Sequence, residues 1–512
     1  MFKKLFVSST SACFEFENTD PYYSPVSYRV YLNGERVGDD RTTNVFSLFD
    51  LTPGTTYTVK TDAEETSVTF TTLRDTEVID VKSLGAKADG QADDTYFVQM
   101  AIDKCSEGGR VVLTEGVYLV RPIVLKSGVT LELKKGATLL GDVREESYPY
   151  VPARNVKSGK ESILSSWEGL PFDCHQSFVS AYKQKNIKII GEGAINGNAD
   201  NSTWWARPKG RKVARPRLVF LNKCKNVVFH GVTCCNSASW NLHPFFSENL
   251  KFYDLKVQNP YTGPNTDGLD PESCDKVDII GCKFSVGDDC CAIKSGKLYM
   301  GKTYKTPASN HTLRNNLFEN GHGAIVLGSE MSGGVKNLSV SQCVFSHTDR
   351  GLRIKTRRGR GKDGVIDGVV FENIKMDNVI TPLVINMYYF CDPDGHTEYV
   401  WSRKSVPVDE GTPYLGKFVF KDIECVNCEC MAGYFDGLVE QPIKEIVIEN
   451  VSFSFKEDAK PFLPAMLENV SEYCKAGLYV DNVENLVLKN VTFSGIVGEK
   501  IIKKNCRNVT VE

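Results

Sequence analysis

The sequence predicts an all-β protein in which a small antiparallel β-sandwich precedes a right-handed parallel β-helix. Three observations predict this fold class. Short segments of alternating apolar and polar residues recur along most of the chain, roughly 23 to 40 residues apart, a spacing typical of solenoid repeats. Long helical patterns are missing between these segments, which favours a β-helix over helical or leucine-rich solenoids. Residues 1–75 follow a different pattern, with tight turns between short strands.

The first 75 residues are predicted to form a domain of their own. The pair Asn33-Gly34 is a typical hairpin turn, and such turns between short strands indicate an antiparallel sandwich. The stretch Leu48–Val59 resembles the part of a fibronectin type III domain that leads into its conserved tyrosine strand. We expect a structural role for this domain and a linker at residues 75–76. The alternating segments are Val26–Leu32, Val45–Leu48, Thr56–Val59 and Ser67–Phe70.

Residues 77–512 repeat one phrase, in which an Asn or Gly precedes alternating apolar residues and a small or polar break. Because side chains alternate across a strand, each phrase has one inward face. A propeller is the structural alternative, but its blades need regularly spaced hairpin turns that the repeats lack. Adjacent strands lie about 4.8 Å apart, so outward polar side chains of a β-helix line a groove. A short helix is expected near residues 93–105. Clear phrases begin at Asn186, Asn226, Asn249, Val277, Asn337, Gly368 and Asn485.

The charge of the chain limits its partners. The formal net charge of −3 gives no global attraction to nucleic acid or to an anionic membrane, and neither is expected as a partner. No stretch approaches the roughly 20 apolar residues of a membrane-spanning helix. Basic residues cluster at 207–217 and 353–362, and each cluster by itself is most simply a solvated loop.

The cysteines favour a reducing compartment. The chain has 17 cysteines, an odd number, with adjacent pairs at 234–235 and 290–291, unlike a secreted disulfide framework. The segment Met1–Val7 begins like a signal peptide, but Ser8–Ser11 interrupts its apolar run. We therefore expect a cytoplasmic protein. Three cysteines within residues 425–430 are expected to be packed thiols, since no fourth metal ligand lies near them in the sequence.

Four short polar motifs interrupt successive repeats of the predicted β-helix. Their separations of about one repeat place them beside one another on one wall of the solenoid. Any one of them alone is more often an ordinary loop or strand than a functional site. Four such motifs, one in each successive repeat, are not well explained by coincidence. The motifs are Asn265-Thr266-Asp267, Gly287-Asp288-Asp289, Gly321-His322-Gly323 and Arg353-Ile354-Lys355.

The carboxylates of these motifs suit the cleavage of a glycosidic bond. An inverting enzyme needs an acid for the leaving oxygen and a base for water, roughly 6.5 to 9.5 Å apart, and aspartates on two neighbouring coils can meet that spacing. Asp288 and Asp289 would point to opposite faces of an ideal strand, so the backbone must turn there, which Gly287 permits. Crowding of the carboxylates raises the proton affinity of one of them.

The remaining motifs favour an acidic substrate. His322 stands between glycines that allow substrate to approach, and its ring could tune the acid. Arg353 and Lys355 alternate on one strand face and would present two cations to a sugar carboxylate.

In this order the four motifs resemble the signature of glycoside hydrolase family 28, the polygalacturonases, over roughly residues 77–512. The resemblance implies a pectin-lyase-like solenoid that inverts the anomeric centre and needs no cofactor or metal. It implies that Asp288 is the general acid, that Asp267 and Asp289 position and deprotonate the water, and that His322 supports the acid. Which of Asp267 and Asp289 is the principal base stays open. Substrate binding is implied for Arg353, Lys355, Asn265, Lys294, His243, Trp240 and Glu330.

Finer features resemble the bacterial exo-acting branch of that family. These are the fibronectin-like module and the longer phrases Asn265–Ser273 and Gly328–Gly334. Exo action, expected from the non-reducing end of oligogalacturonate or polygalacturonate, needs a blocked groove. Residues 198–216 and 297–307 are candidates for the walls. In the first of these, Trp204 and Trp205 either stack on sugar rings or pack beneath a loop, and the sequence leaves both open.

Three other functions stay in view. A rhamnogalacturonan or xylogalacturonan hydrolase would use the same motifs, since Arg353 and Lys355 read only the sugar at the cleavage site. A pectate lyase would use Ca²⁺ and a basic residue, with no need for three carboxylates. A non-catalytic carbohydrate-binding solenoid predicts that substitution of Asp288 changes nothing measurable. The oligomeric state is left open.

Overall fold

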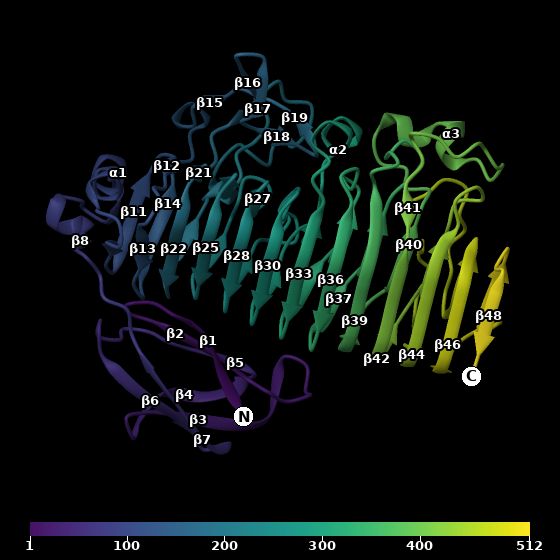
Figure 1. The fold of residues 1–512 in the computed structure, drawn as a ribbon, viewed down its shortest axis with the longest axis horizontal. Helices are drawn as coiled ribbons and strands as arrows, with labels where there is room; N and C mark the ends of the chain where they lie inside the picture. Colours follow the sequence, from purple (N-terminus) through teal and green to yellow (C-terminus); the bar gives the residue numbers. More distant parts are fainter.

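The structure, a computed structural model, describes residues 1–512 and consists of a β-sandwich beside a long parallel β-helix (Figure 1). The right-handed β-helix predicted from the repeats is confirmed. The sandwich lies against one side of the N-terminal half of the solenoid, and the long loops emerge on the opposite side (Figure 1). No helix in the structure has the length and apolar character needed to cross a membrane.

Residues 1–75 form two packed antiparallel sheets. Phe2 is buried in the sandwich core, where its ring lies 5.7 Å from that of Phe46. The first residues are therefore a core strand of this domain. One sheet has the order β1 (Phe2–Val7), β2 (Ala12–Phe16) and β5 (Val45–Leu48), and the other β4 (Glu35–Thr43), β3 (Tyr23–Leu32), β6 (Thr56–Thr61) and β7 (Glu64–Thr71).

Polar contacts fix the sandwich to the solenoid. Arg314 Nε and Nη2 donate to the two oxygens of Glu15 at 2.6 and 2.7 Å. The buried ring of His230 lies between the hydroxyls of Ser11 and Ser47, at 3.0 and 2.9 Å. Asp75, expected in a linker, has a side chain that is 8% exposed and pairs with Arg110, so the connection is held in place.

Each coil of the β-helix contributes strands to three walls. The first wall contains β8 (Val78–Asp80), β10 (Arg110–Leu113), β13 (Thr130–Leu133), β22 (Lys185–Gly191), β25 (Lys225–His230), β28 (Glu248–Tyr253), β30 (Asp275–Ile280), β33 (Ala308–Arg314) and β36 (Val335–Ser341). The second contains β9 (Asp89–Asp93), β11 (Gly116–Val120), β14 (Ala137–Gly141), β23 (Ala194–Asn196), β26 (Thr233–Cys235), β29 (Lys256–Gln258), β31 (Lys283–Ser285), β34 (Leu317–Gly321) and β37 (Val344–Thr348).

In the later coils one long strand runs through both of these walls. Because these strands belong to both walls, backbone hydrogen bonds join the two walls into one sheet of 24 strands. The later strands of this sheet are β39 (Val365–Asp377), β41 (Tyr414–Leu415), β42 (Lys417–Cys428), β44 (Ile443–Phe455), β46 (Val483–Ser494) and β48 (Asn508–Val511).

The third wall is interrupted at the coil of the first polar motif. There, isolated bridges from Leu242 to Leu269 and from Leu269 to Cys291 replace a regular strand and join two shorter sheets. The first sheet is β12 (Ile123–Val124), β21 (Val179–Tyr182), β24 (Val219–Asn222) and β27 (Leu242–Phe245). The second is β32 (Asp289–Ile293), β35 (Gly323–Gly328), β38 (Arg350–Lys355), β40 (Thr381–Asn386), β43 (Met431–Asp436), β45 (Ala476–Asp481) and β47 (Ile501–Lys504).

Helices and insertions are short. The predicted helix is α1 (Thr95–Lys104). The others are α2 (Leu298–Tyr304), α3 (Glu398–Trp401) and the 3₁₀ turns η1 (Val81–Leu84), η2 (Glu145–Ser147), η3 (Ala199–Asn201) and η4 (Pro393–His396). An insertion before β21 carries β15 (Tyr150–Val151), β16 (Arg154–Lys157), β17 (Lys160–Ile163), β18 (Ser166–Trp167), β19 (Leu170–Pro171) and β20 (Cys174–His175).

The asparagine that opens many repeats has a physical reason. Asn186, Asn226 and Asn249 have φ of 57°, 56° and 55°, a left-handed conformation that Asn adopts more readily than most residues. Their side chains form a ladder, in which the amide of Asn226 donates to Asn186 at 3.0 Å and that of Asn249 to Asn226 at 2.8 Å. The repeats therefore turn and stack at the same residue.

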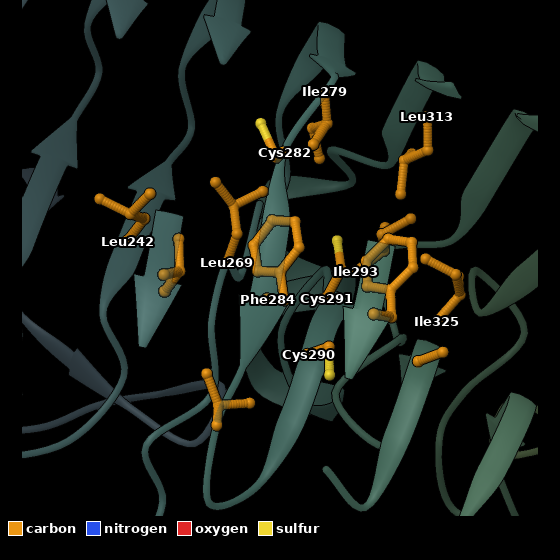
Figure 2. Close-up of a cluster of buried hydrophobic side chains, with 14 of the residues drawn as sticks. Leu242, Leu269, Ile279, Cys282, Phe284, Cys290, Cys291, Ile293, Leu313 and Ile325 are labelled. Atoms are coloured by element: carbon orange, nitrogen blue, oxygen red, sulfur yellow. The ribbon is translucent and has the colours of Figure 1, made fainter. Parts of the chain in front are cut away.

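The inside of the coils is one continuous apolar core. Phe284 and Phe318 of successive coils stack with ring centroids 5.2 Å apart. Cys290 and Cys291 lie among these aliphatic and aromatic side chains (Figure 2), and burial raises the pKa of both thiols. All 17 cysteines are free, and the three within residues 425–430 are buried in the same interior as packed thiols.

Candidate active site

The four polar motifs meet on the outer face of the third wall. Parallel pairing places Asp289 at the start of β32 opposite Gly323 of β35, and places Gly328 of β35 opposite Lys355 of β38. These side chains surround a cavity of about 460 Å³. Its lining includes Asn265, Asp267, Asp288, Asp289, Lys294, His322, Glu330, Arg353, Lys355 and Trp240.

The backbone turns before β32, as the adjacent aspartates require. Gly287 and Asp288 form a bend, and the strand begins at Asp289, whose backbone N–H donates to Asp288 Oδ1 at 2.9 Å. A β-carbon at Gly287 would collide with the carbonyl oxygens of Gly263 and Pro260 in the preceding coil. Glycine is thus required there for close approach of two coils, and the turn brings both carboxylates to the cavity.

The three carboxylates are close together but differ in exposure. One oxygen from each of Asp267, Asp288 and Asp289 lies within 4.8 Å of the others. The roughly 6.5 to 9.5 Å expected for an inverting enzyme refers to the separation of whole carboxyl groups, and that expectation stays a prediction. The Asp288 side chain is 23% exposed, whereas that of Asp289 is 1% exposed. Asp288 is therefore the carboxylate most open to a bound molecule.

Asp289 is held in its ionised form. Lys355 Nζ lies 2.7 Å from Asp289 Oδ2, and Arg353 Nη1 lies 3.3 Å from Asp289 Oδ1. Burial by itself would raise the pKa of Asp289, but the charges of Lys355 and Arg353 outweigh it and hold the pKa well below its usual range. The two cations predicted for a sugar carboxylate thus already share a protein carboxylate.

Asp267 has the opposite environment. Burial, followed by the charges of Asp270 and Asp288, raises the pKa of Asp267 well above its usual range. Lys294 Nζ lies 3.8 Å from Asp267, 3.9 Å from Asp270 and 3.2 Å from Glu330. Burial disfavours the charged form of Lys294, but the charges of these carboxylates outweigh burial and raise the pKa of Lys294. Burial would raise the pKa of Glu330, but the charges of Lys294 and Lys297 outweigh it and lower that pKa to about 2. The site therefore contains a buried ionic network centred on Lys294.

His322 reaches the cavity from the next coil. Its backbone N–H donates to the carbonyl of Asp288 at 3.0 Å, and its ring Nδ1 lies 3.5 Å from Asp288 Oδ1. This contact with Asp288 raises the pKa of His322. The side chain is 40% exposed, and the ring of Tyr261 meets its edge at 6.0 Å.

His243 does not reach the cavity, in contrast to its predicted role in substrate binding. The residue is fully buried, its Nε2 lies 2.9 Å from Glu272 Oε2, and its ring packs edge-on against Trp240 at 4.9 Å. Trp240 itself lines the cavity, beneath Lys294, whose Nζ lies 4.5 Å from the ring centroid. His243 therefore supports Trp240 from below and cannot contact a ligand directly.

The two segments predicted to block the groove, residues 198–216 and 297–307, contribute little to the cavity lining. Trp204 is buried, Trp205 is partly buried against the core and donates its ring N–H to Ser237 O at 3.1 Å, and neither lines the cavity. The loop that carries them still contributes Lys209 and Gly210 to the cavity. Residues 297–307 contain α2, and none of them lines the cavity. Asn265 lines it and is held by Arg215 Nη2 at 2.6 Å.

The basic clusters are more buried than solvated loops would be. Arg215 and Arg217 of the first cluster are buried, as are Arg357, Arg358 and Arg360 of the second. Both Arg357 and Arg360 reach Asp392, at 3.4 and 3.3 Å, and Lys297 reaches it at 2.9 Å. These arginines anchor a loop at the cavity edge.

Several residues in or near the cavity lie outside the four short motifs. Asp270 stands three positions after Asp267, is fully buried, and has no hydrogen-bond partner on either carboxylate oxygen. Its closeness to Lys294 depends on the bridge between Glu272 and Lys294. The others come from loops far apart in the chain: Trp167, Glu168, Ser329, Tyr389, Cys391, Asp392, Pro393 and Met466.

Comparisons of the sequence with known proteins identify glycosyl hydrolases as its relatives. The sequence profile of the glycosyl hydrolases family 28 matches residues 158–409. An endo-polygalacturonase of Pectobacterium carotovorum subsp. carotovorum is 33% identical over 311 residues, 58% of this chain and 72% of the relative. An exo-poly-alpha-D-galacturonosidase of Dickeya chrysanthemi is 28% identical over 431 residues, 76% of this chain and 69% of the relative.

Two solved structures are also similar. A hyperthermoactive exopolygalacturonase from Thermotoga maritima has a TM-score of 0.67 at 27% identity, over 82% of this chain and 92% of that one. A family 28 exopolygalacturonase from Yersinia enterocolitica has a TM-score of 0.74 at 20% identity, over 99% of this chain and 98% of that one. The second likeness is one of fold, and its coverage includes the N-terminal sandwich.

Proposed function

The chain belongs to glycosyl hydrolase family 28. From this premise we propose that the protein hydrolyses α-1,4 bonds between galacturonate units and acts from the end of the polysaccharide. The observation that carries the proposal is the meeting of three aspartates with Arg353 and Lys355 in one cavity. Two carboxyl functions are the minimum for glycoside hydrolysis, and neighbouring cations select a sugar that carries a carboxylate.

Asp288 is the general acid in this proposal. It is the most exposed of the three carboxyl groups, so a leaving oxygen can reach it, and His322 lies at 3.5 Å to support it. Acid catalysis at this position would protonate the glycosidic oxygen as the bond to the anomeric carbon breaks.

Asp289 and Asp267 act on the water. Since Lys355 and Arg353 keep Asp289 ionised, Asp289 is the better base. Asp267, whose pKa is raised by burial, retains its proton and can orient the same water by a hydrogen bond. The different surroundings of the two aspartates support this division of roles.

The loops around the cavity support exo action. On one side, β18 ends at Trp167, and Trp167, Glu168 and Lys209 border the cavity. On the other side, the loop Tyr389–Pro393 and Met466 border it. These residues border the cavity, and closure of the groove at one end would admit only the terminal unit of a substrate chain. Attack from the non-reducing end is part of the proposal.

Rhamnogalacturonan or xylogalacturonan remains the second candidate substrate, because the aspartates and cations would contact only the sugar at the cleavage site. A pectate lyase would leave an unsaturated product that absorbs ultraviolet light, which hydrolysis does not. A non-catalytic solenoid would leave the substrate intact.

The test is to incubate the purified protein with trigalacturonate and with polygalacturonate and to follow the products by chromatography. Galacturonate alone from the earliest times supports an exo-hydrolase. A ladder of oligomers would replace exo by endo action, and the absence of cleavage would favour substrates that contain rhamnose or xylose. An ultraviolet-absorbing product would overturn hydrolysis.

For the compartment, we propose the cytoplasm and a substrate of imported oligogalacturonides. The 17 free cysteines support this proposal, since thiols without disulfide partners are typical of reducing surroundings. Recovery of the native protein with an N-terminus cleaved near Ala12, which would remove β1, would overturn it.

A further inference from the structure

A second cavity lies on the third wall, beyond the candidate active site. We propose that it binds one acidic pyranose unit, such as galacturonate, at a site separate from the catalytic one. Its volume is about 340 Å³, at the lower end of the range of small-molecule sites and thus suited to about one sugar unit. Its lining includes Arg403, Tyr434, Asn469, Tyr479, Lys504 and Asn505.

This cavity occupies the same outward columns of the wall as the active site. Lys355 of β38 pairs with Asn386 of β40, Asn386 with Asp436 of β43, Asp436 with Asp481 of β45, and Asp481 with Lys504 of β47. Adjacent strands lie about 4.8 Å apart, so Asp436 lies roughly 10 Å from Lys355 along the solenoid. Tyr434 and Tyr479 continue the column of Arg353 in the same way.

One loop separates the two cavities. Met466 lines the first, and residues 469–471 line the second. The loop is held down at its base, where Asn386 Nδ2 donates to Met466 O at 2.9 Å and Arg350 Nε donates to Pro464 O at 3.0 Å. A sugar in the second cavity would therefore be a separate ligand and would not extend through the active site.

The two tyrosines form a fixed wall of the second cavity. Their rings stack with centroids 4.9 Å apart and planes 10° apart. Tyr434 donates its hydroxyl to Asp436 at 2.9 Å, and Tyr479 donates to Asp481 at 3.2 Å. Because both phenols are already bound, neither ring turns when a ligand enters, and the site is preorganised for a polar ring.

The charges of the cavity select a carboxylate. Arg403 is paired with Asp436 through two hydrogen bonds of 2.5 and 2.8 Å, so its charge is compensated. Asp481 also lines the cavity, but both of its oxygens already accept hydrogen bonds, from Asn505 Nδ2 at 2.9 Å and from the Tyr479 hydroxyl at 3.2 Å. Lys504 lines the cavity without an ion pair, and its Nζ lies 5.2 Å from the Tyr479 ring centroid. With Lys504 as the cation outside any ion pair and Asn469 as an amide partner for hydroxyls, the set matches a hydroxylated ring that carries one negative charge.

The choice of galacturonate as the ligand rests on the proposed function. Two sources can supply it, the free monosaccharide released by hydrolysis and the terminal unit of a longer chain. Calorimetric titration with galacturonate, and of an Asp289→Asn protein with trigalacturonate, distinguishes them. If the second cavity binds both ligands, it accepts the free monosaccharide. If it binds only trigalacturonate, it recognises the terminal unit of a longer chain.

The decisive variant is Lys504→Ala, matched by Lys503→Ala. Lys503 stands next to Lys504 on β47 but falls in the column of Val480, so it does not line the cavity. We expect Lys504→Ala to weaken one binding event about tenfold or more, with Lys503→Ala unchanged, because a charge-assisted hydrogen bond is lost. Lys355→Ala should weaken the other event, at the active site.

Unchanged titrations of Lys504→Ala with both ligands would overturn the proposal. So would the loss of all galacturonate and trigalacturonate binding in Lys355→Ala. Trigalacturonate hydrolysis is measured separately on the wild-type protein. Hydrolysis without a Lys504-dependent binding event would refute this inference alone, whereas that binding event without hydrolysis would refute the proposed function alone.

Discussion

Lys355 Nζ lies 2.7 Å from Asp289 Oδ2, although the two residues are 66 positions apart in the sequence. The register of three strands brings them together, since β35 lies between β32 and β38 and presents Gly323 opposite Asp289. With no side chain at Gly323, the Asp289 carboxylate can extend across β35 toward Lys355. The ion pair holds Asp289 ready to accept a proton.

We expect Lys355→Met to move the acidic limb of the pH profile of kcat/KM to higher pH. A carboxylate base is active when deprotonated, so activity falls as pH drops through its pKa. Loss of the Lys355 charge raises the lowered pKa of Asp289, and the acidic limb should therefore shift to higher pH by roughly one pH unit or more. The measurement is kcat/KM for trigalacturonate across acidic pH.

Lys362→Met is the matched control for this change. Lys362 is exposed and pairs with Glu410 at 2.6 Å, away from the cavity. Its substitution removes the same charge and should leave the profile in place. An unshifted limb in Lys355→Met would show that Asp289 is not the titrating base.

Asp288→Asn should retain substrate binding and lose turnover by a factor on the order of 10² to 10⁴, the usual contribution of positioned acid catalysis. The variant keeps the shape of the side chain but cannot protonate the leaving oxygen. Steady-state kcat and calorimetric binding of galacturonate separate the two effects. Asp39→Asn, on an exposed strand of the sandwich, is the control. Wild-type turnover in Asp288→Asn would remove Asp288 from the role of acid.

Gly323→Ala should lower kcat by roughly 10- to 100-fold, since small displacements of a catalytic group are costly. A β-carbon at Gly323 would lie 2.5 Å from Val326 Cγ2 and 3.3 Å from Asp289 Oδ1. The double variant Gly323→Ala, Val326→Ala relieves the first clash and leaves the second. If the double variant recovers full activity, the effect comes from packing of Val326 and not from Asp289.

Glu272→Gln should flatten the dependence of stability on pH between about pH 6.5 and 8. Burial raises the pKa of Glu272 to about 8, so folded Glu272 keeps a proton that the unfolded chain loses near its ordinary pKa. Stability contributed by this group therefore falls as pH rises toward 8, by up to roughly 1.4 kcal/mol per pH unit. Burial lowers the pKa of His243, which opposes this trend only below about pH 6.5.

The measurement is the free energy of unfolding by denaturant at pH 6.5, 7.25 and 8. A glutamine can donate to His243 Nε2 as the protonated Glu272 does, so the packing is preserved. Glu248→Gln, which alters a more exposed carboxylate, serves as the control. Equal slopes in wild type and Glu272→Gln would mean that Glu272 is ionised in the folded protein.

Hydrolysis should invert the anomeric centre, so that the first product formed from an α-linked substrate is β-galacturonate. In the proposed arrangement Asp288 protonates the leaving oxygen while Asp289 deprotonates a water, which is the single displacement of an inverting enzyme. Proton NMR of the reaction during the first minutes reports the anomer before it equilibrates. An initial α product would require Asp289 or Asp267 to act as a nucleophile.

Much of the fold and of the site follows from local pattern. Alternation of apolar residues predicts strands, and the one-repeat separation of the motifs predicts that Asp267, Asp289 and Lys355 share one wall. Trp204 is different, because a tryptophan in a loop has the same sequence signal whether it faces sugar or packs inside. The neighbourhood of His243 in the chain suggests a substrate contact, yet in strand β27 its side chain is buried against Glu272.

The sequence by itself determined the periodic strands, the stacking of four polar motifs and the chemistry that their side chains can perform, because a parallel β-helix converts equal spacing along the chain into neighbours in space. Only the tertiary structure decided which aspartate is ionised, which loops close the cavity and where the second cavity lies. Those properties depend on burial and on charges from distant segments, such as Met466 and Lys504, whose distances no local pattern contains.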